Sequence, residues 1–345
     1  MKRLSLFLPS LAGGGVERVF AQLANEFVAR GHRVDLILAT AEGPYLEELQ
    51  RDVRVTNLGS PSVSGALPAL VRHLRNTKPD ALLSGLDHAN LIAIAAILLC
   101  GRGIRCVISS RSIPSIWYRQ SRTVRSWLLV QMMRRLYRRA DAIIVNSAAG
   151  ASDLEQFLRL PRKTMAVIAN PIDVAAIEKL SLQHEPHDCC RAGQSPLILA
   201  IGRLDPVKDF PTLIRAFARL RSRRSGRLVI LGEGPERQKL ESLARELDVL
   251  DDVCLPGFVA NPFPCLRNAA VLASSSLSEG CPNAVMQALA CGTPVVSTES
   301  IGGVAEVLQQ GRWGRLVPVG DSEALADGIT ATLDATESPD GRLRA

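Results

Sequence analysis

The chain has 345 residues, of which 47% are apolar and 22% are charged, and its formal net charge is +7. This composition is typical of a globular protein and excludes an extended disordered chain. Because one hydrophobic core rarely serves so long a chain, we expect two domains of roughly 150 residues each. Residues 1–172 carry a net charge of +11 and residues 173–345 a net charge of −4, so we expect the two halves to have different partners.

The first residues, MKRLSLFLPSLAGGG, combine basic residues with a short apolar run. Because Leu4–Leu8 leads into a glycine-rich turn without a small-residue cleavage site, we predict a buried strand rather than a secretory signal. The apolar stretch Leu91–Cys100 is shorter than the roughly 20 residues that cross a bilayer, so we predict a core helix there. We expect no membrane span and a cytoplasmic protein.

Eight cysteines occur, at positions 100, 106, 189, 190, 254, 265, 281 and 291. They form no C-x-x-C pair and show no zinc-finger spacing, and most lie in apolar segments. We therefore expect buried free thiols in a reducing cytoplasm rather than disulfides or zinc ligands. Metal binding by the adjacent Cys189 and Cys190, which lie in a polar stretch, is the alternative.

Short apolar runs alternate with helical patterns in both halves of the chain. In the first half we predict strands at Leu4–Leu8, Val34–Leu38, Ala81–Ser84, Cys106–Ser109 and Ala142–Val145, with a helix at Val16–Arg30. In the second half we predict strands at Leu197–Ile201, Leu228–Leu231, Val253–Leu255, Ala270–Ala273, Pro294–Ser297 and Gly314–Val317. This alternation implies crossover connections and parallel sheets with helices on both faces.

The segment Lys179–Pro196 is polar and has no period, so we place a linker at 176–196. It would separate an N-terminal domain, 1–175, from a C-terminal domain, 197–335, with a frayed tail at 336–345. We expect an α/β protein whose two doubly wound domains face each other across a central cleft. Ligands of such sheets bind beyond the carboxyl ends of the strands, so four post-strand loops are the places to search for chemistry.

The first of these loops, Pro9–Arg18, contains three glycines and opens a helix. Glycines let backbone N–H groups approach an anion at a helix N-terminus, where the helix dipole favours negative charge. The spacing is not that of a nicotinamide-dinucleotide fingerprint, because Arg18 stands where the third glycine should be. A tight turn and an anion site both remain open for this loop.

The next two loops follow strands of the second half. The loop Ile201–Asp209 carries Arg203 and Lys208, which suit a diphosphate because Arg binds two oxygens at once and Lys supplies a mobile point charge. A solvated loop is the alternative. We interpret the Gly-x-Gly of Leu231–Arg237 as a tight strand-to-helix turn, with Pro235 at the first helical position.

The fourth loop is SEGCPNAVMQALACGTPVVS, Ser278–Ser297. Pro282 can start a helix whose first turn holds Asn283 and leaves N–H groups for a phosphate. Glu279 precedes this helix and Gln287 lies about one turn into it, so both side chains can reach one ligand. A carboxylate suits a sugar because it only accepts hydrogen bonds and hydroxyls donate them.

At these loops the sequence resembles glycosyltransferase family 4. The segments that carry the resemblance are GGGVERV, VNSAAGASDL, ANPID, GRLDPVKDFPTLIRAF, LVILGEGPERQKLE, LPGFVANP, SSLSEGCPNAVMQALACGTPVVS, GGVAEVL and GRLVPVGD. They have family counterparts in the same order and cover nearly the whole chain. The resemblance implies a retaining enzyme of the GT-B fold, similar to amino-sugar transferases that act on lipid-linked or envelope glycans.

The resemblance also implies roles for individual residues. Glu279 would contact the hexose of a nucleoside diphosphate sugar, Gln287 would lie at its ribose, and Arg203 and Lys208 would clamp its diphosphate. Glu279, Arg203 and Lys208 are thus the candidate catalytic residues. The remaining candidate donor contacts are Gly14, Gly15, Phe258, Gly280, Cys281, Pro282 and Asn283, with the backbone near Phe258 facing the base.

Two positions depart from the family pattern. Gln287 replaces a second acidic residue, so one charge-assisted hydrogen bond to the ribose becomes neutral, at a cost of roughly 1 kcal/mol or somewhat more. Arg111, in the loop SSRSIPS, stands in the region where many members place a His near the reacting carbon. Because Arg cannot act as a base, its role on the acceptor side would be electrostatic, toward a phosphate.

The expected mechanism is front-face transfer with retention, in which the departing diphosphate helps to deprotonate the acceptor. The sequence has no Asp-x-Asp, so we expect no catalytic metal and no cofactor. The segment 117–139 contains seven Arg and no acidic residue, with apolar residues interleaved. It predicts either a basic amphipathic helix on an anionic membrane, at the inner face, or a sheet-covering helix with a solvated Arg face.

The function that we expect is transfer of a hexose or N-acetylhexosamine, with UDP favoured, to a glycan or a polyisoprenyl-diphosphate-linked acceptor of the cell envelope. A catalytically weak relative that binds a nucleotide sugar as a partner or sensor module is the alternative, because of Gln287 and the missing His. An epimerase would need further acid–base groups. Nucleic-acid binding is not expected, because aromatic residues make up only 4% of the chain and no reader motif occurs.

Overall fold

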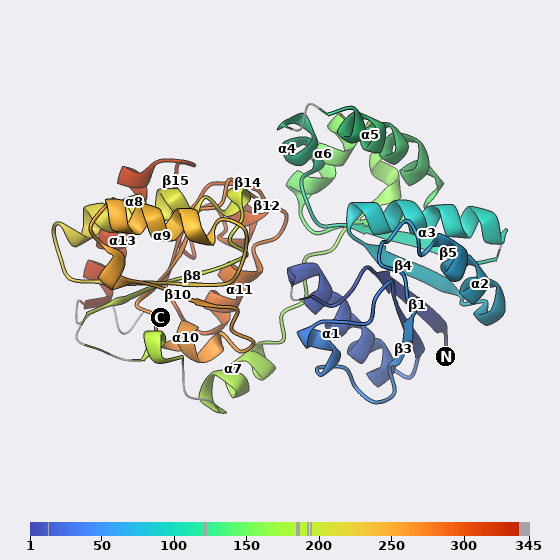
Figure 1. Ribbon diagram of the computed structural model, residues 1–345, viewed down its shortest axis with the longest axis horizontal. Coiled ribbons are helices and arrows are strands. Elements are labelled where there is room, and N and C mark those ends of the chain that lie inside the picture. Colours follow the sequence, from blue (N-terminus) through green and yellow to red (C-terminus); the bar gives the residue numbers. More distant parts are fainter. Residues whose placement is uncertain are drawn as a thin grey trace. The chain divides into compact units, whose positions relative to one another are not determined.

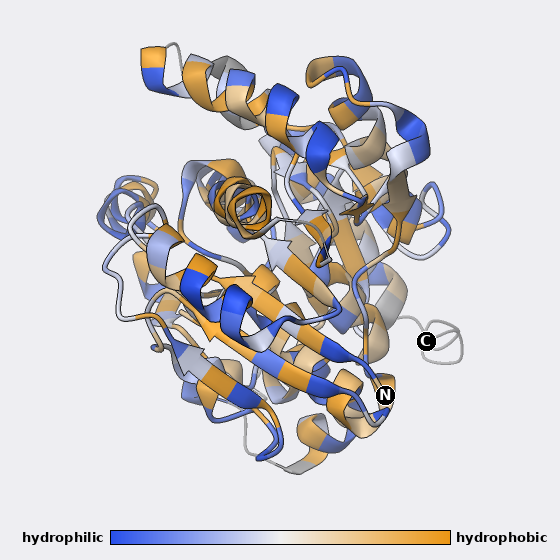
Figure 2. Ribbon diagram, turned by 90° about the vertical axis from the view of Figure 1, so that its right-hand side faces the viewer, coloured by the Kyte–Doolittle hydropathy of each residue, from blue (hydrophilic) through white to orange (hydrophobic). Residues whose placement is uncertain are grey.

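The structure is a computed structural model, and it describes residues 1–12, 14–101, 103–120, 123–183, 187–191, 193 and 195–337. Contacts divide the chain into two compact units, Met1–Asn170 and Pro171–Ala345. Each unit is built around its own parallel sheet (Figure 1). Figure 2 shows the strands as mostly hydrophobic ribbons and many of the helices as bands of both kinds, as expected for helices that cover a sheet.

The first unit contains a seven-stranded parallel sheet in the order β3-β2-β1-β4-β5-β6-β7. Its strands are β1 (Arg3–Leu8), β2 (Arg33–Leu38), β3 (Arg54–Asn57), β4 (Ala81–Gly85), β5 (Arg105–Ser110), β6 (Ala142–Val145) and β7 (Met165–Val167). The five strands predicted for this half are confirmed to within two residues. The edge strands β3 and β7 were not predicted, because they are short and mostly exposed and so lack an apolar run.

Helices cover both faces of this sheet. They are α1 (Gly15–Ala29), α2 (Leu67–Thr77), α3 (Asp87–Cys100), α4 (Pro114–Gln120), α5 (Val124–Leu136) and α6 (Ala148–Phe157). Helix α1 packs against one face, through a cluster that includes Phe20, Leu6 and Leu36. Helices α2, α3 and α5 pack against the other face. Alternate residues of each strand therefore enter different cores, as a buried parallel sheet requires.

The second unit contains a six-stranded parallel sheet in the order β10-β9-β8-β11-β13-β15. Its strands are β8 (Leu197–Ile201), β9 (Arg227–Leu231), β10 (Val253–Gly257), β11 (Val271–Ser274), β13 (Val295–Thr298) and β15 (Arg315–Val317). These confirm the six predicted strands to within two residues. A separate parallel pair, β12 (Ser278–Glu279) with β14 (Ile301–Gly302), was not predicted.

Helices also cover both faces of the second sheet (Figure 1). They are α7 (Val174–Gln183), α8 (Phe210–Arg221), α9 (Arg237–Glu246), α10 (Phe263–Asn268), α11 (Asn283–Ala290), α12 (Val304–Val307) and α13 (Ser322–Glu337). Helices α8, α9 and α13 share one core, and α7, α10, α11 and α12 share the other. The post-strand loops that carry the candidate donor residues connect β8 to α8 and β11 to α11.

The predicted linker at 176–196 falls in the stretch that contacts assign to the second unit. Helix α7 covers its first part and packs against α10. A 3-10 turn, η4 (Asp188–Cys190), lies near its centre. The period that would have revealed α7 is interrupted by polar residues, and burial of Ile177 against the second sheet holds the helix in place. The predicted tail falls on the end of α13 and on residues 338–345, which lie outside the described residues.

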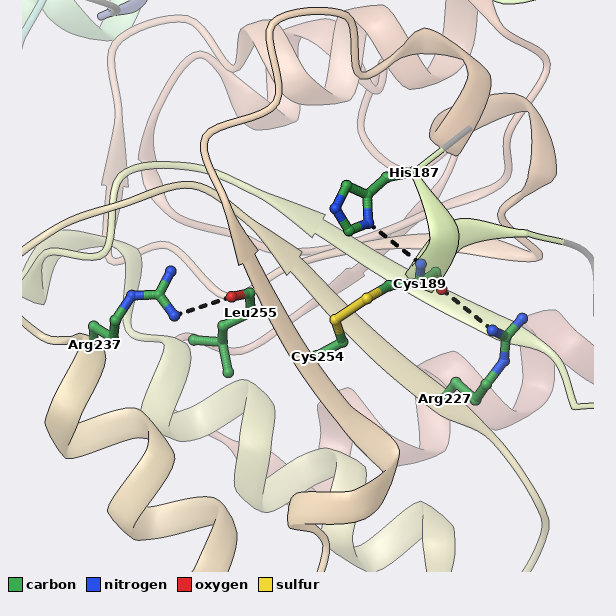
Figure 3. The surroundings of a disulfide bond; sticks show 6 residues. All are labelled: His187, Cys189, Arg227, Arg237, Cys254 and Leu255. Carbon is green, nitrogen blue, oxygen red and sulfur yellow. Dashed lines mark hydrogen bonds between the residues drawn. A yellow bond between two sulfur atoms is a disulfide. The ribbon is translucent and has the colours of Figure 1, made fainter. Parts of the chain in front are cut away.

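The prediction of free thiols is wrong for two cysteines, because a disulfide joins Cys189 of η4 to Cys254 of β10 (Figure 3). The Arg227 guanidinium donates a hydrogen bond to the Cys189 carbonyl, and the Cys189 N–H donates to the His187 ring. Cys190 lies beside Cys265, and a hydrogen bond between the two thiols, together with burial, raises the pKa of Cys190. The sequence could not predict this pairing, because the two bonded cysteines are 65 residues apart.

The predicted basic helix at 117–139 is instead two helices, α4 and α5, followed by a 3-10 turn, η2 (Tyr137–Arg139). Thr123 caps α5 by accepting a hydrogen bond from the Ser126 N–H, and so starts a new helix. The core helix predicted at Leu91–Cys100 is confirmed as part of α3. Among the helices described, none has the length and the apolar run that crossing a bilayer would require.

Candidate functional site

The second unit brings two predicted residues into direct contact. Lys208 ends a 3-10 turn, η5 (Pro206–Lys208), after β8, and Glu279 lies in β12 after β11. The Lys208 Nζ donates a hydrogen bond of 2.5 Å to the Glu279 Oε1, although the two residues are 71 positions apart. Both side chains are mostly buried, at 21% and 16% exposed. A cation and a carboxylate from separate loops therefore meet at the carboxyl edge of the sheet, as the doubly wound fold predicts.

The backbone of the two loops is joined as well. The Leu277 N–H donates to the Val207 carbonyl at 2.8 Å, and the Ser275 hydroxyl donates to the Lys208 carbonyl at 2.8 Å. The Ser276 hydroxyl donates to the same Glu279 oxygen that Lys208 contacts, at 2.8 Å. The first two bonds join the backbones of the two loops, and the third holds the Glu279 carboxylate.

Pairing of β12 with β14 also holds Glu279. The Gly303 N–H donates to the Glu279 carbonyl at 2.9 Å. Gly302 has a φ of +135°, and a Cβ atom there would lie 1.7 Å from that same carbonyl oxygen. The close approach therefore requires glycine. The motif GGVAEVL contained this signal, but only the pairing of two short strands shows what the glycines do.

Arg203 is placed differently from Lys208. Its side chain is 71% exposed, and its Nε donates to the Asp205 Oδ2 at 3.0 Å. The loop after β9 packs closely against the backbone just before Arg203, since a Cβ atom on Gly232 would lie 2.0 Å from the Gly202 carbonyl oxygen. This agrees with the tight turn predicted for Leu231–Arg237. The predicted helical position of Pro235 is wrong, because it lies in the turn before α9.

Helix α11 begins where the sequence indicated. Pro282 is its N-cap residue and Asn283 its first residue, and the Pro282 side chain makes no capping hydrogen bond. The first amide groups of a helix have no acceptor within the helix, so this end of α11 suits an anion. Gln287 lies one turn further and is partly buried, and Cys281 just before the helix is buried. Gly280 adjoins them, and Phe258, at 46% exposed, follows β10.

The candidate residues of the first unit lie at the carboxyl ends of β1 and β5. Gly14 is the N-cap of α1 and Gly15 its first residue. A Cβ atom on Gly14 would lie 2.3 Å from the Glu17 carboxylate, which therefore folds back over this helix end. The anion site predicted for the glycine loop stays a prediction.

Arg111 follows β5 and is held by its own unit. Its Nε donates to the Ser109 hydroxyl at 2.9 Å, and its Nη1 donates to the Asn170 side chain. The guanidinium also lies 5.8 Å from the centre of the Phe20 ring. These contacts fix the direction of the side chain and leave its predicted electrostatic role untested.

Sequence reasoning missed a polar cluster around Asp87, the first residue of α3. Its carboxylate accepts hydrogen bonds from the Tyr137 hydroxyl at 3.1 Å and from the Ser112 hydroxyl at 3.4 Å. Burial raises the pKa of Asp87, although these hydrogen bonds act against the shift. The preceding Leu86 has a φ of +75°, which is uncommon for a residue other than glycine. The signal in the sequence was an acidic residue three positions after the predicted strand Ala81–Ser84.

The cluster ties the loop after β5 to the core. The buried Asn90 donates to the Ser109 carbonyl at 2.9 Å and accepts from the Ser84 hydroxyl at 2.7 Å. Together with the bond from Ser112 to Asp87, these contacts position both ends of the short segment that carries Arg111.

Comparison with known proteins agrees with this geometry. Residues 13–176 match the model of Glycosyltransferase Family 4, and residues 195–335 match the model of Glycosyl transferases group 1. One relative, of Campylobacter jejuni, is named N-acetylgalactosamine-N,N'-diacetylbacillosaminyl-diphospho-undecaprenol 4-alpha-N-acetylgalactosaminyltransferase. It is 31% identical over 343 residues, which cover 97% of this chain and 91% of the relative. The lipopolysaccharide core biosynthesis glycosyltransferase LpsE of Rhizobium meliloti is 28% identical, covering 92% of this chain and 84% of LpsE.

A solved structure of HepE from Anabaena, in complex with UDP-glucose, has a TM-score of 0.81 to this chain. The match covers 98% of this chain and 91% of HepE, with 20% sequence identity, and this likeness confirms the predicted GT-B fold. The family models, the relative that covers nearly the whole chain, and the loops that bring Lys208 to Glu279 support one conclusion. The chain belongs to the family 4 glycosyltransferases.

Proposed function

We propose that this glycosyltransferase moves a hexose or N-acetylhexosamine from a nucleoside diphosphate sugar, with UDP favoured, to a glycan or polyisoprenyl-diphosphate-linked acceptor of the cell envelope. The observation that carries the proposal is the meeting of Lys208 with Glu279 beside the N-terminus of α11. The name of the Campylobacter relative supports an amino sugar and a lipid diphosphate acceptor. UDP-glucose in the HepE structure supports the choice of UDP.

Each residue has a role set by its chemistry. Lys208 and Arg203 bind the diphosphate, together with the first amide groups of α11. Glu279 accepts hydrogen bonds from the sugar hydroxyls, and Gln287 contacts the ribose with one acceptor oxygen and two donor hydrogens. Backbone near Phe258 contacts the base.

The proposed reaction retains the configuration at the sugar C1. The bond from C1 to the diphosphate oxygen breaks, and the bond from C1 to the acceptor oxygen forms on the same face. The acceptor proton passes to the departing diphosphate, whose negative charge Lys208 and Arg203 stabilise. No protein nucleophile takes part and no metal is needed, so full activity in excess chelator is expected, and a strict requirement for a divalent ion would count against the scheme.

A membrane-facing surface fits a lipid-linked acceptor and a cytoplasmic enzyme at the inner face of the membrane. Helices α3 and α5 pack together and expose apolar side chains: Leu98, Leu99, Val124, Trp127, Leu128 and Met132. A hollow of about 650 Å³ beside them is lined by Leu98, Leu136, Arg134, Arg135, Arg138 and Arg139. Cations next to exposed apolar groups suit anionic lipid headgroups, at roughly 1 kcal/mol for each cation near the surface.

Co-sedimentation with anionic and neutral vesicles at low salt tests this surface. We expect binding to anionic vesicles only, and weaker binding for the double variant Arg135→Glu with Arg139→Glu. Arg245→Glu, at an exposed position of α9, is the matched control. Absence of binding to anionic vesicles would remove the membrane from the proposal.

One observation favours a second function. Because Gln287 cannot accept from both ribose hydroxyls as a carboxylate does, the chain could bind a nucleotide sugar without efficient transfer and act as a partner or sensor module. Turnover with an acceptor separates the two functions, since a binding module retains donor affinity but forms no glycoside.

Calorimetry with a panel of nucleotide sugars, in chelator, tests the proposed donor site. We expect micromolar binding of one donor by the wild type and loss of its sugar selectivity in Glu279→Ala. Glu246→Ala, at an exposed position of α9, controls for removal of a carboxylate. If no donor binds, the donor-site assignment is wrong. If a donor binds, a polyprenyl-diphosphate-linked glycan is then supplied as acceptor and the product linkage is determined by NMR.

A further inference from the structure

The Glu279 carboxylate is held through one of its two oxygens. Its Oε1 accepts from the Ser276 hydroxyl at 2.8 Å and from the Lys208 Nζ at 2.5 Å. Within the part of the chain that the structure describes, no hydrogen bond to the Oε2 occurs. The two donors therefore set the rotation of the carboxylate and leave one oxygen for a ligand.

Ser276 is itself fixed in place. Its residue is 2% exposed, and its carbonyl accepts a hydrogen bond of 2.6 Å from the Thr298 hydroxyl. Thr298 ends β13 and is fully buried. The Ser276 hydroxyl is thus attached to the rigid sheet, three residues before the carboxylate that it contacts.

The two donors differ in what a bound donor substrate would do to them. Lys208 is a mobile cation, and a diphosphate beside it competes with Glu279 for its charge. Ser276 is neutral and fixed, so a diphosphate does not draw it away. When Lys208 turns toward the diphosphate, Ser276 remains to hold the Glu279 Oε1.

We propose that Ser276 is a positioning residue that sets sugar recognition by holding Glu279 while Lys208 binds the diphosphate. This inference rests on the proposed function, because it needs a nucleoside diphosphate sugar at this site. It predicts that Ser276 matters for the sugar part of the donor and not for the nucleotide part.

Calorimetry separates the contribution of the sugar to binding from that of the nucleotide. The ligands are UDP, UDP-N-acetylglucosamine, UDP-N-acetylgalactosamine and UDP-glucose. The quantity to compare is a ratio: the affinity for the UDP-sugar that the wild type binds, divided by the affinity for UDP alone. In Ser276→Ala we expect this ratio to fall roughly tenfold, because a hydrogen bond to a charged group is lost, while UDP affinity stays unchanged.

The matched control is Ser181→Ala. Ser181 of α7 is also buried, and its hydroxyl donates to the Glu178 carbonyl at 2.7 Å within the same helix. We expect an unchanged ratio in this variant. A fall in the ratio as large as that in Ser276→Ala would overturn the inference.

A double-mutant cycle distinguishes positioning of Glu279 by Ser276 from a purely structural role of Ser276. In a Glu279→Ala background, Ser276→Ala is expected to have no further effect on the ratio, because Ser276 acts through Glu279. Equal loss of UDP and UDP-sugar affinity in Ser276→Ala, or an unchanged ratio, would overturn this inference and leave the proposed function standing. Failure of the wild type to bind UDP or any UDP-sugar would overturn the proposed function and this inference with it.

Discussion

The Gly302→Ala substitution tests how the structure holds Glu279. Gly302 pairs with Glu279 across the short β12–β14 ladder. A Cβ atom on Gly302 would lie 1.7 Å from the Glu279 carbonyl oxygen, whereas real Cβ atoms do not approach closer than 3.0 Å. The two strands must therefore separate by about 1 Å or more, which moves the Glu279 backbone.

The cost has two parts. A φ of +135° strains any residue with a Cβ by about 1–3 kcal/mol. Separation of the strands breaks the 2.9 Å hydrogen bond from the Gly303 N–H to the Glu279 carbonyl, which costs about 1 kcal/mol. A total of about 3 kcal/mol corresponds to a fall in the melting temperature of roughly 6–12 °C for a domain of this size.

Gly292→Ala is the matched control. Gly292 also has a positive φ, +72°, but nothing lies within 4 Å of a Cβ atom built there. Only backbone strain is expected, about 1 kcal/mol or roughly 2–4 °C.

Thermal unfolding by circular dichroism and calorimetry with UDP-sugars measure both variants. We expect Gly302→Ala to unfold at a much lower temperature than Gly292→Ala and to lose sugar affinity even at temperatures where it remains folded. Equal melting temperatures and equal UDP-sugar affinities in the two variants would refute the claim that Gly302 positions Glu279.

Three further predictions concern other parts of the chain. Gln287→Glu is expected to bind UDP five- to tenfold more tightly, because a charged acceptor at the ribose is worth about 1 kcal/mol more than a neutral one; weaker binding by calorimetry would contradict the ribose assignment. The raised pKa of Asp87 means that the folded state keeps its proton more firmly than the unfolded state, so wild-type stability should fall as the pH rises from the ordinary carboxyl pKa through the raised one. Asp87→Asn has no group to titrate there, so the difference in urea midpoint between wild type and variant should depend on pH in that window; a constant difference would disprove the shift. Cys254→Ser removes the disulfide to Cys189, which spans 65 residues, and chain entropy predicts that the free energy of unfolding falls by about 4 kcal/mol. If reductant leaves the urea midpoint of the wild type unchanged, the disulfide is not stabilising.

Much of the fold could be predicted because each buried strand is a short apolar run that can be recognised from its own residues. Runs such as Leu197–Ile201 are apolar on both faces, and the helices between them have apolar residues at helical spacing. The edge strand Arg54–Asn57 was missed for the opposite reason, since one side of it faces solvent and it has no apolar run. Helix α7 was missed because packing against the second sheet, rather than its own sequence, stabilises it.

The candidate site, too, could be predicted only in part. The rule that ligands bind at the carboxyl ends of parallel strands located the loops of Lys208 and Glu279, because strand ends can be predicted from the sequence. It could not show that the two side chains meet, or that Ser276 shares the same carboxylate oxygen. Asp87 was missed because its partners Ser112 and Tyr137 come from segments 25 and 50 residues away.

By itself, the sequence determined the buried strands, the α/β class and the loops that carry chemistry, because these depend on periodicity and on residues close together in the chain. Only the tertiary structure decided which side chains touch: Lys208 with Glu279, and Cys189 with Cys254. The physical reason is that such contacts join residues more than 60 positions apart. Their formation depends on the packing of the second sheet and of its helices, which no local pattern encodes.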